Sequence, residues 1–366
     1  MSEIEVKKVT NRAGTGSPNF PYGLKSGGTT VDVSGPTRTE GETQPETPAE
    51  GDTFYDTAND TYDVYIGEDW RRILGEGGGN PVAWYGDRGV YFAMAGSTPV
   101  NHMNYISIAT PGNATDFADL YLAIRYGNSG VSDGTYGVIF GGLTTANLYG
   151  EDIQYFTVAT QANTTNFGTL TVGRFDAGGC SDGTYGVCYA GNAAANDNYI
   201  DYVTIATPGN ATTFGNSVTS DRGISGWSDE TYGVFFGTQN DARIDYITIA
   251  TPGNASDFGA LTVNRYSSGA GGDTTRAVSG GGYNNYNTID YVTIATPGNA
   301  TDFGDLTVGR WALAGTSDTT YTVFAGGYSN YNVMDYITVQ STGNATDFGD
   351  LVNGGYALGG LSGASA

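Results

Sequence analysis

The stretch IDYVTIATPGNATDFGDLTVGR, residues 289–310, recurs along the chain and decides its fold. Its relatives are NYISIATPGNATDFADLYLAIR, IQYFTVATQANTTNFGTLTVGR, IDYVTIATPGNATTFGNSVTSDR, IDYITIATPGNASDFGALTVNR and MDYITVQSTGNATDFGDLVNGG. The tyrosines of the six copies, spaced by 50, 47, 44, 45 and 45 residues, are Tyr105, Tyr155, Tyr202, Tyr246, Tyr291 and Tyr336. A period of this length is typical of an array of one small structural unit.

Each unit has the sequence pattern of four short strands. In the last full copy, alternating apolar residues and turn clusters predict strands at 306–315, 320–327, 333–340 and 345–351. Four antiparallel strands in each repeat, arranged radially, form the unit of a β-propeller. The rival fold is a β-solenoid, whose repeats are usually shorter and whose ends need capping segments.

The two ends of the array favour the propeller. The opening copy has a second strand at 87–96 but no first strand before it, while the tail, 350–365, aligns on the first strand of the preceding copy, 305–320. One unit split between the two ends closes a ring, which an open solenoid does not require. We therefore predict an all-β, six-bladed β-propeller over residues 82–366, with residues 351–360 completing the blade that begins near Val90.

The repeat resembles the kelch family of propellers, which has an Arg before the first strand, Gly-Gly after the second, a Tyr in the third and a Trp in the fourth. The matching residues are Arg310, Gly326, Gly327, Tyr336 and Phe348 in one copy, and Arg125, Gly141, Gly142, Tyr155 and Phe167 in another. Phe replaces Trp in every copy, and Gly237-Thr238 breaks one Gly-Gly pair, so the resemblance implies a kelch-like propeller. Propellers of this kind include enzymes and adaptors, so the fold alone assigns no function.

Arginine and aspartate recur together in five copies. A guanidinium that binds a carboxylate and nearby carbonyls would lock one blade to the next, so we expect structural inter-blade pairs rather than a ligand site. The residues are Arg125, Arg174, Arg222, Arg265 and Arg310, with Asp133, Asp182, Asp229, Asp273 and Asp318.

Composition and charge exclude several classes of function. The chain has 366 residues, 58 of them Gly, and a net charge of −23, of which residues 81–366 contribute −16 from 24 acidic and 8 basic residues. Such an acidic surface repels nucleic-acid backbones and anionic lipids. With no apolar run of 18 residues and no leader-like start, we expect neither a membrane span nor a secretion signal.

The sequence offers little for catalysis or metal binding. His102 is the sole histidine, and Cys180 and Cys188 are the only cysteines; we expect a loop histidine and free thiols, with a hairpin disulfide as the alternative. The repeated PGNAT turns match the glycosylation pattern, but Asn there also suits a turn that needs positive φ. We expect no catalytic residues, no metal and no cofactor.

Loops between the second and third strands vary from copy to copy and carry the candidate ligand contacts. Tyr and Asn supply stacking area and hydrogen bonds for sugars or protein surfaces. The candidates are Tyr149, Asn196, Asn198, Asn240, Tyr283, Asn285, Tyr286, Tyr328, Asn330 and Tyr331.

The first eighty residues differ from the repeats. Residues 1–50 are rich in Pro, Gly, Thr and Glu and predict an extended arm; 51–75 predict a small β-hairpin module, and 76–81 a Gly-rich linker. NRAGTGSPNFPYGL and PAEGDTFYDTANDTYDVYIGEDWRRI are similar to segments of marine and cyanobacterial phage fibre and appendage proteins. This resemblance implies a virion anchor, for which the candidate residues are Asn19, Phe20, Pro21, Tyr22 and Leu24.

Together these features predict a non-enzymatic bacteriophage appendage, assembled in the host cytoplasm and located in the virion. Its arm docks on capsid or tail proteins, and its propeller faces a host-surface glycan or protein. The alternatives are capsid or tail decoration without receptor binding, and a polysaccharide-degrading enzyme. An arm that gains burial only against other chains also predicts a homotrimer.

Overall fold

The computed structural model divides the chain into two compact units, Met1–Val82 and Ala83–Ala366. In the first unit it describes only strands; in the second it describes residues 85–92, 99–126, 129–144, 146, 148–194, 198–239, 241–328, 331–356 and 359–364. The described residues are all β and loop, with no helix among them, and hence none that could cross a membrane.

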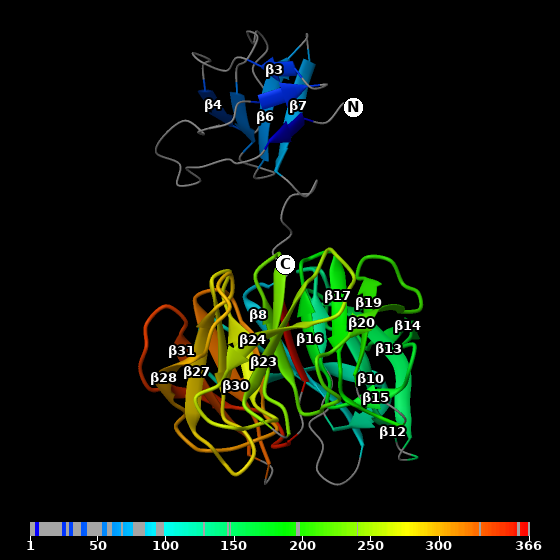
Figure 1. Cartoon of the computed structure of the whole chain (residues 1–366), viewed down its shortest axis with the longest axis vertical. Helices are drawn as coiled ribbons and strands as arrows, with labels where there is room; N and C mark the ends of the chain where they lie inside the picture. The colour runs from blue at the N-terminus through cyan, green and yellow to red at the C-terminus, as the bar shows by residue number, and fades with distance from the viewer. Residues whose placement is uncertain are drawn as a thin grey trace. The chain divides into compact units, whose positions relative to one another are not determined.

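The first unit contains one seven-stranded sheet in the order β3-β2-β1-β7-β6-β5-β4 (Figure 1). Its strands are β1 (Ile4–Val6), β2 (Leu24–Ser26), β3 (Thr29–Val31), β4 (Arg38–Gly41), β5 (Thr53–Asp56), β6 (Thr61–Ile66) and β7 (Asp69–Gly75). β1 pairs parallel with β7, and β4 parallel with β5. The structure thus differs from the expected free arm, because strands before residue 50 find backbone partners in the 51–75 module.

The second unit is built from groups of four antiparallel strands (Figure 1), of which groups 1 and 2 are joined into one eight-stranded sheet by the pairing of β10 with β12. Group 1 consists of β33 (Gly359–Gly363), β8 (Arg88–Phe92), β9 (Val100–Ser107) and β10 (Thr115–Arg125), and group 2 of β11 (Gly130–Ser132), β12 (Tyr136–Thr144), β13 (Tyr149–Thr157) and β14 (Thr165–Thr169). Group 3 consists of β16 (Gly178–Ser181), β17 (Tyr185–Tyr189), β19 (Tyr199–Thr204) and β20 (Thr212–Asn216), and group 4 of β21 (Ser225–Ser228), β22 (Tyr232–Phe236), β23 (Arg243–Thr248) and β24 (Ser256–Ala260). Group 5 consists of β25 (Gly269–Gly272), β26 (Arg276–Gly280), β27 (Thr288–Thr293) and β28 (Thr301–Asp305), and group 6 of β29 (Ala314–Ser317), β30 (Tyr321–Ala325), β31 (Val333–Thr338) and β32 (Thr346–Asp350). A short pair, β15 (Arg174–Phe175) and β18 (Asn192–Ala193), lies outside these groups.

The chain's tail completes group 1. β33 pairs antiparallel with β8, with Gly359 opposite Phe92 and Gly363 opposite Arg88. The expected first strands began too early: 306–315 was expected where β29 spans Ala314–Ser317, and 351–360 was expected where β33 spans Gly359–Gly363. The preceding Leu-Thr-Val-x-Arg segment is a connection: Leu306 donates its backbone N–H to Asn287 rather than to a ladder partner.

Neighbouring groups share their apolar cores. Each of the apolar clusters in the second unit draws side chains from two consecutive groups. One more cluster joins Tyr91 and Ile106 of group 1 to Val323 and Phe348 of group 6. The first strands are also neighbours in sequence order, and β29 of group 6 lies beside β33 of group 1.

The PGNAT turns connect each group to its neighbour through hydrogen bonds, which we call the asparagine brackets. In all six turns the Asn side-chain oxygen accepts the backbone N–H of the fifth residue of the neighbouring outer strand, at 3.0–3.1 Å. The residue after each Asn donates its own N–H to the carbonyl of that same neighbour, at 2.8–3.0 Å. Asn299 and Ala300 of group 5, for example, bind Ala260 of group 4, and Asn113 of group 1 binds Asp350 of group 6. The expected role in a positive-φ turn was wrong, since none of the six Asn has positive φ.

Three of the repeated arginines form buried ion pairs, but not with the expected aspartates. Their partners lie on the third strand of the group that follows: Arg174 with Asp201 at 2.9 Å, Arg265 with Asp290 at 2.8 Å, and Arg310 with Asp335 at 2.6 Å. The same carboxylates accept hydrogen bonds from Thr171, Thr262 and Thr307, which leave the outer strand of the preceding group. In these three copies, the ion pair therefore holds the segment before the first strand against the third strand of the same group.

The aspartates expected as partners have a local role. Each one caps the hairpin between first and second strands, where its Oδ1 accepts the backbone N–H groups two and three residues on. Such Asx turns satisfy backbone donors at the tip. The capping residues are Asp133, Asp182, Asp229, Asp273 and Asp318.

The remaining arginines do not make these pairs. Counting from the first strand, Asp221 occupies the repeated Arg position in group 4, so Arg222 is one residue out of register with the other copies. Arg125 lies 5.1 Å from the ring of Tyr126, and the third strand of its group carries Gln154 in place of the aspartate. In group 4 the equivalent carboxylate, Asp245, instead accepts the hydroxyl of Tyr189 at 2.5 Å.

Candidate functional site

One residue position, three or four residues before the first strand of each group, carries large side chains at one end of the second unit. It follows the repeated Arg, and the next residue turns sharply: φ is 55° at Asp176, 71° at Gly223, 55° at Ser267 and 58° at Ala312. The six residues at this position are Tyr126, Phe175, Arg222, Tyr266, Trp311 and Tyr356. Five are aromatic, and the sixth is an arginine.

These aromatic residues join others from the variable loops into a continuous chain of ring contacts, which we call the aromatic rim. In order along the chain of contacts, its members are Tyr149, Phe175, Tyr126, Tyr356, Tyr328, Trp311, Tyr283 and Tyr266. Successive ring centroids are 4.5–6.2 Å apart, with stacked geometry between Trp311 and Tyr328 at 4.5 Å and between Tyr266 and Tyr283 at 4.8 Å. Mutual stacking holds the rings in place before any ligand arrives.

The rim remains accessible to solvent. Tyr149, Tyr283 and Tyr328 are 38%, 40% and 43% exposed, and the other members are partly buried. Large exposed aromatic groups that lie together on a soluble protein are typical of a binding surface.

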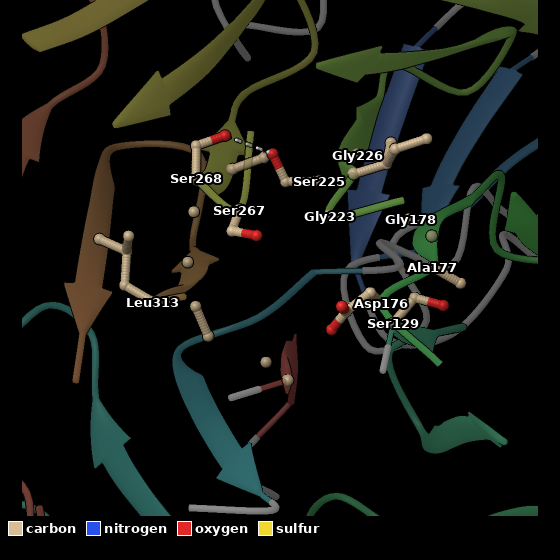
Figure 2. Close-up of a pocket in the computed structure, with 18 of the residues that line it drawn as sticks. Ser129, Asp176, Ala177, Gly178, Gly223, Ser225, Gly226, Ser267, Ser268 and Leu313 are labelled. Carbon is tan, nitrogen blue, oxygen red and sulfur yellow. Dashed lines mark hydrogen bonds between the residues drawn. The ribbon is translucent and has the colours of Figure 1, made fainter. Parts of the chain in front are cut away.

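A small polar pocket lies next to the rim. It has a volume of about 90 Å³, and its wall includes the residues that directly follow four of the rim positions: Asp176, Gly223, Ser267 and Ala312. Figure 2 shows that its labelled lining comes from several groups, with Asp176 and Ser129 apart from Ser267 and Ser268. Pockets that hold small-molecule ligands are roughly 300–1,000 Å³. This pocket has room for a few waters, so a larger ligand would lie across the rim.

The rim is interrupted in group 4, where a polar gap consisting of Arg222, Gln239 and Asp176 replaces aromatic rings. Nε of Arg222 donates to Oε1 of Gln239 at 3.1 Å. Removal from bulk water raises the pKa of Asp176 to about 7, and the Arg222 guanidinium acts in the opposite direction. Burial also raises the pKa of Tyr266, the last ring of the rim, and Gln239 acts in the opposite direction.

Some of the loop residues expected to contact a ligand belong to the rim and some do not. Tyr149, Tyr283 and Tyr328 are members. Asn198, Asn285, Tyr286 and Tyr331 are not among its ring contacts, and their recorded role is in loop structure: Tyr286 and Tyr331 donate backbone N–H groups to Gly282 and Gly327, Asn198 accepts one from Ser217, and Asn285 has φ of 59°. Asn196, Asn240 and Asn330 lie outside the described residues, as do Asn19, Phe20, Pro21 and Tyr22; Leu24 begins β2.

Five rim residues were missed from the sequence: Tyr126, Phe175, Tyr266, Trp311 and Tyr356. The signal was the residue directly after the repeated arginine, which is aromatic in five of six copies when the repeats are aligned.

Other chemistry-bearing residues do not form a second site. His102 lies on β9, not in a loop, with its Nδ1 3.8 Å from an Asp119 oxygen, and both side chains are about half exposed. Cys180 and Cys188 are free and buried; Cys180 is opposite Val187 and Cys188 opposite Gly179, so the two thiols face different apolar clusters. Within the described part of the chain no group of three potential metal ligands occurs.

No protein-family model matches the chain, and no curated protein matches it in sequence.

Proposed function

We propose that the second unit is a closed six-bladed, kelch-like β-propeller whose aromatic rim binds a ligand on a host-cell surface. The closed ring is supported by three features that return from group 6 to group 1: the shared core of Tyr91 and Phe348, the Asn113 bracket to Asp350, and the neighbouring strands β29 and β33. The pairing of β33 with β8 combines strands from the two ends of the unit into one blade, as the six sequence repeats require.

The wider proposal is a non-enzymatic virion appendage of a bacteriophage. Its support is the similarity of the N-terminal segments to phage fibre and appendage proteins. In this account the first unit docks on capsid or tail proteins, the protein is a homotrimer, and the propeller is presented to the host. For a homotrimer, light scattering of the intact protein should give three times the mass of one chain. The mass of a single chain would contradict the homotrimer.

The aromatic rim is the observation that carries the recognition function. Eight rings in contact, three of them more than a third exposed, provide flat apolar faces beside polar groups. The C–H faces of sugar rings and the apolar parts of peptides both pack on such surfaces, and rigid aromatic anchors lose little entropy on binding. A catalytic function has less support, because the rim presents one pocket carboxylate, Asp176, and glycosidases use two.

The test is binding of the full chain to host cells and to a glycan array. Trp311→Ala and Tyr328→Ala each remove a stacked ring, and we expect about a 10- to 100-fold loss of affinity. Tyr121→Ala is the matched control: Tyr121 is 40% exposed but lies outside the rim, where its hydroxyl binds Asp152. Unchanged binding in both rim variants would contradict the proposal, and absence of binding with normal virion incorporation would favour decoration.

A further inference from the structure

The aromatic rim has one opening, and the groups in that opening are unlike the rest of the site. Ring contacts run from Tyr149 to Tyr266 but skip group 4, where Arg222 occupies the position that is aromatic in the other five groups. Gln239, on the loop after β22, accepts a hydrogen bond from Arg222. Asp176 of group 3 lies beside Gly223, the residue after Arg222, whose backbone N–H donates to the Asp176 carbonyl at 2.9 Å. The opening therefore contains a cation, an amide and a carboxylate.

These polar groups retain capacity for hydrogen bonds. Within the described residues, Arg222 makes one side-chain hydrogen bond, through Nε to Gln239, and neither of its Nη nitrogens has a partner. The Asp176 carboxylate has no hydrogen-bond partner among the same residues, although the residue is partly buried. A partly desolvated carboxylate without a donor is unfavourable, and a hydrogen bond from a ligand hydroxyl would stabilise it.

Resting on the proposed recognition function, we infer that the rim takes a neutral, hydroxyl-rich saccharide and that Arg222, Gln239 and Asp176 fix its orientation. Two neighbouring hydroxyls match the polar gap, because one can donate to Asp176 while the other accepts from an Nη of Arg222. The adjacent Tyr266 supplies the stacking face for the same sugar ring.

Charge selects the neutral class over a charged one. The net charge of −16 over residues 81–366 disfavours an extended polyanion, and Asp176, where it is ionised, offsets the single positive charge of Arg222. A polycation would be drawn to the surface but would meet Arg222 in the gap. A neutral polymer uses both groups as hydrogen-bond partners without a net repulsion.

The experiment measures binding of the full chain to immobilised neutral glucan, galactan and mannan, to a carboxylated polyuronate and to amine-bearing chitosan. We expect binding to at least one neutral polymer, with about a 10- to 100-fold loss in Asp176→Ala and in Arg222→Gln. The control is Arg276→Gln, which removes a partly exposed arginine that donates to the carbonyl of Val339 and lies over the ring of Tyr291, neither of which belongs to the rim or the polar gap. Circular dichroism and the thermal midpoint establish that each variant is folded.

The outcomes separate this inference from the proposed function. Preference for the polyuronate, with binding lost in Arg222→Gln and increased in Asp176→Ala, overturns the neutral class; preference for chitosan overturns it as well. Loss of binding in Trp311→Ala with full binding in both polar variants overturns the role of the gap and leaves the rim in place. Host-cell binding that is unchanged in both Trp311→Ala and Tyr328→Ala refutes the proposed function itself.

Discussion

Replacing Arg310 with Ala should destabilise the second unit by about 5–7 kcal/mol. The side chain is fully buried, its Nη1 lies 2.6 Å from Asp335, and it donates to the carbonyls of Gly326 at 2.7 Å and Phe324 at 3.1 Å. Removing one partner of a buried ion pair costs about 3–5 kcal/mol, and each stranded carbonyl adds about 1 kcal/mol. The side chain also packs on Gly327, so a void is left beside it.

The assay is urea unfolding of the full chain followed by tryptophan and tyrosine fluorescence, with thermal unfolding as a second measure. Arg243→Ala is the control, because its pair with Asp241 is partly exposed and such pairs contribute below about 1 kcal/mol. The double variant Arg310→Gly with Asp335→Asn reproduces what group 1 has naturally at Gly355 and Asn104, and we expect it to be more stable than Arg310→Ala. A loss of less than 1 kcal/mol in Arg310→Ala, or a double variant less stable than the single one, would refute the reasoning.

Two further predictions concern the brackets and the dependence of stability on pH. Asn299→Ala removes the side-chain acceptor for the Ala260 N–H and should lower the free energy of unfolding in urea by about 1 kcal/mol. Asn353 is exposed and makes no such bond, so Asn353→Ala should leave the free energy of unfolding unchanged. Burial raises the pKa of Asp245 to about 6, above the unfolded value of about 3.9, so the folded state holds this proton more tightly and stability should fall as pH rises from about 4 to 7. Asp245→Asn should remove that component and be more stable than the native chain above pH 7, by up to about 3 kcal/mol; a steeper pH dependence in the variant would show that another group is responsible.

The repeats predicted the strand groups well because their signals are local. Alternating apolar residues and Gly/Asn/Asp turns lie within a few residues of one another, and the periodic tyrosines mark the third strands. The pairing of the tail with residues 88–92 followed from which strand each end lacked. The single sheet formed within residues 1–82 was harder to predict from the sequence, because the parallel pairing of β1 with β7 joins residues about seventy positions apart.

Partners across the structure could not be read from spacing alone. Arg310 and Asp318 are neighbours in sequence, but the first strand carries Asp318 to a hairpin tip while Asp335, on the third strand, lies against the guanidinium. The PGNAT asparagines were assigned a turn role because their acceptor function involves a different repeat. The rim was missed for the same reason, as its rings come from separate loops and meet only after the repeats assemble.

The pairing of the two ends of the second unit is tested most directly by a disulfide between them. Val90 and Leu361 are opposite one another on β8 and β33 and share one apolar cluster, so cysteines at both positions are close enough to be linked. We predict that Val90→Cys with Leu361→Cys forms an intramolecular disulfide under mild oxidation, seen as altered mobility on a non-reducing gel, while Leu361→Cys with Ile244→Cys does not. Free thiols in the first pair, or equal linkage in both, would contradict a propeller closed by its own two ends.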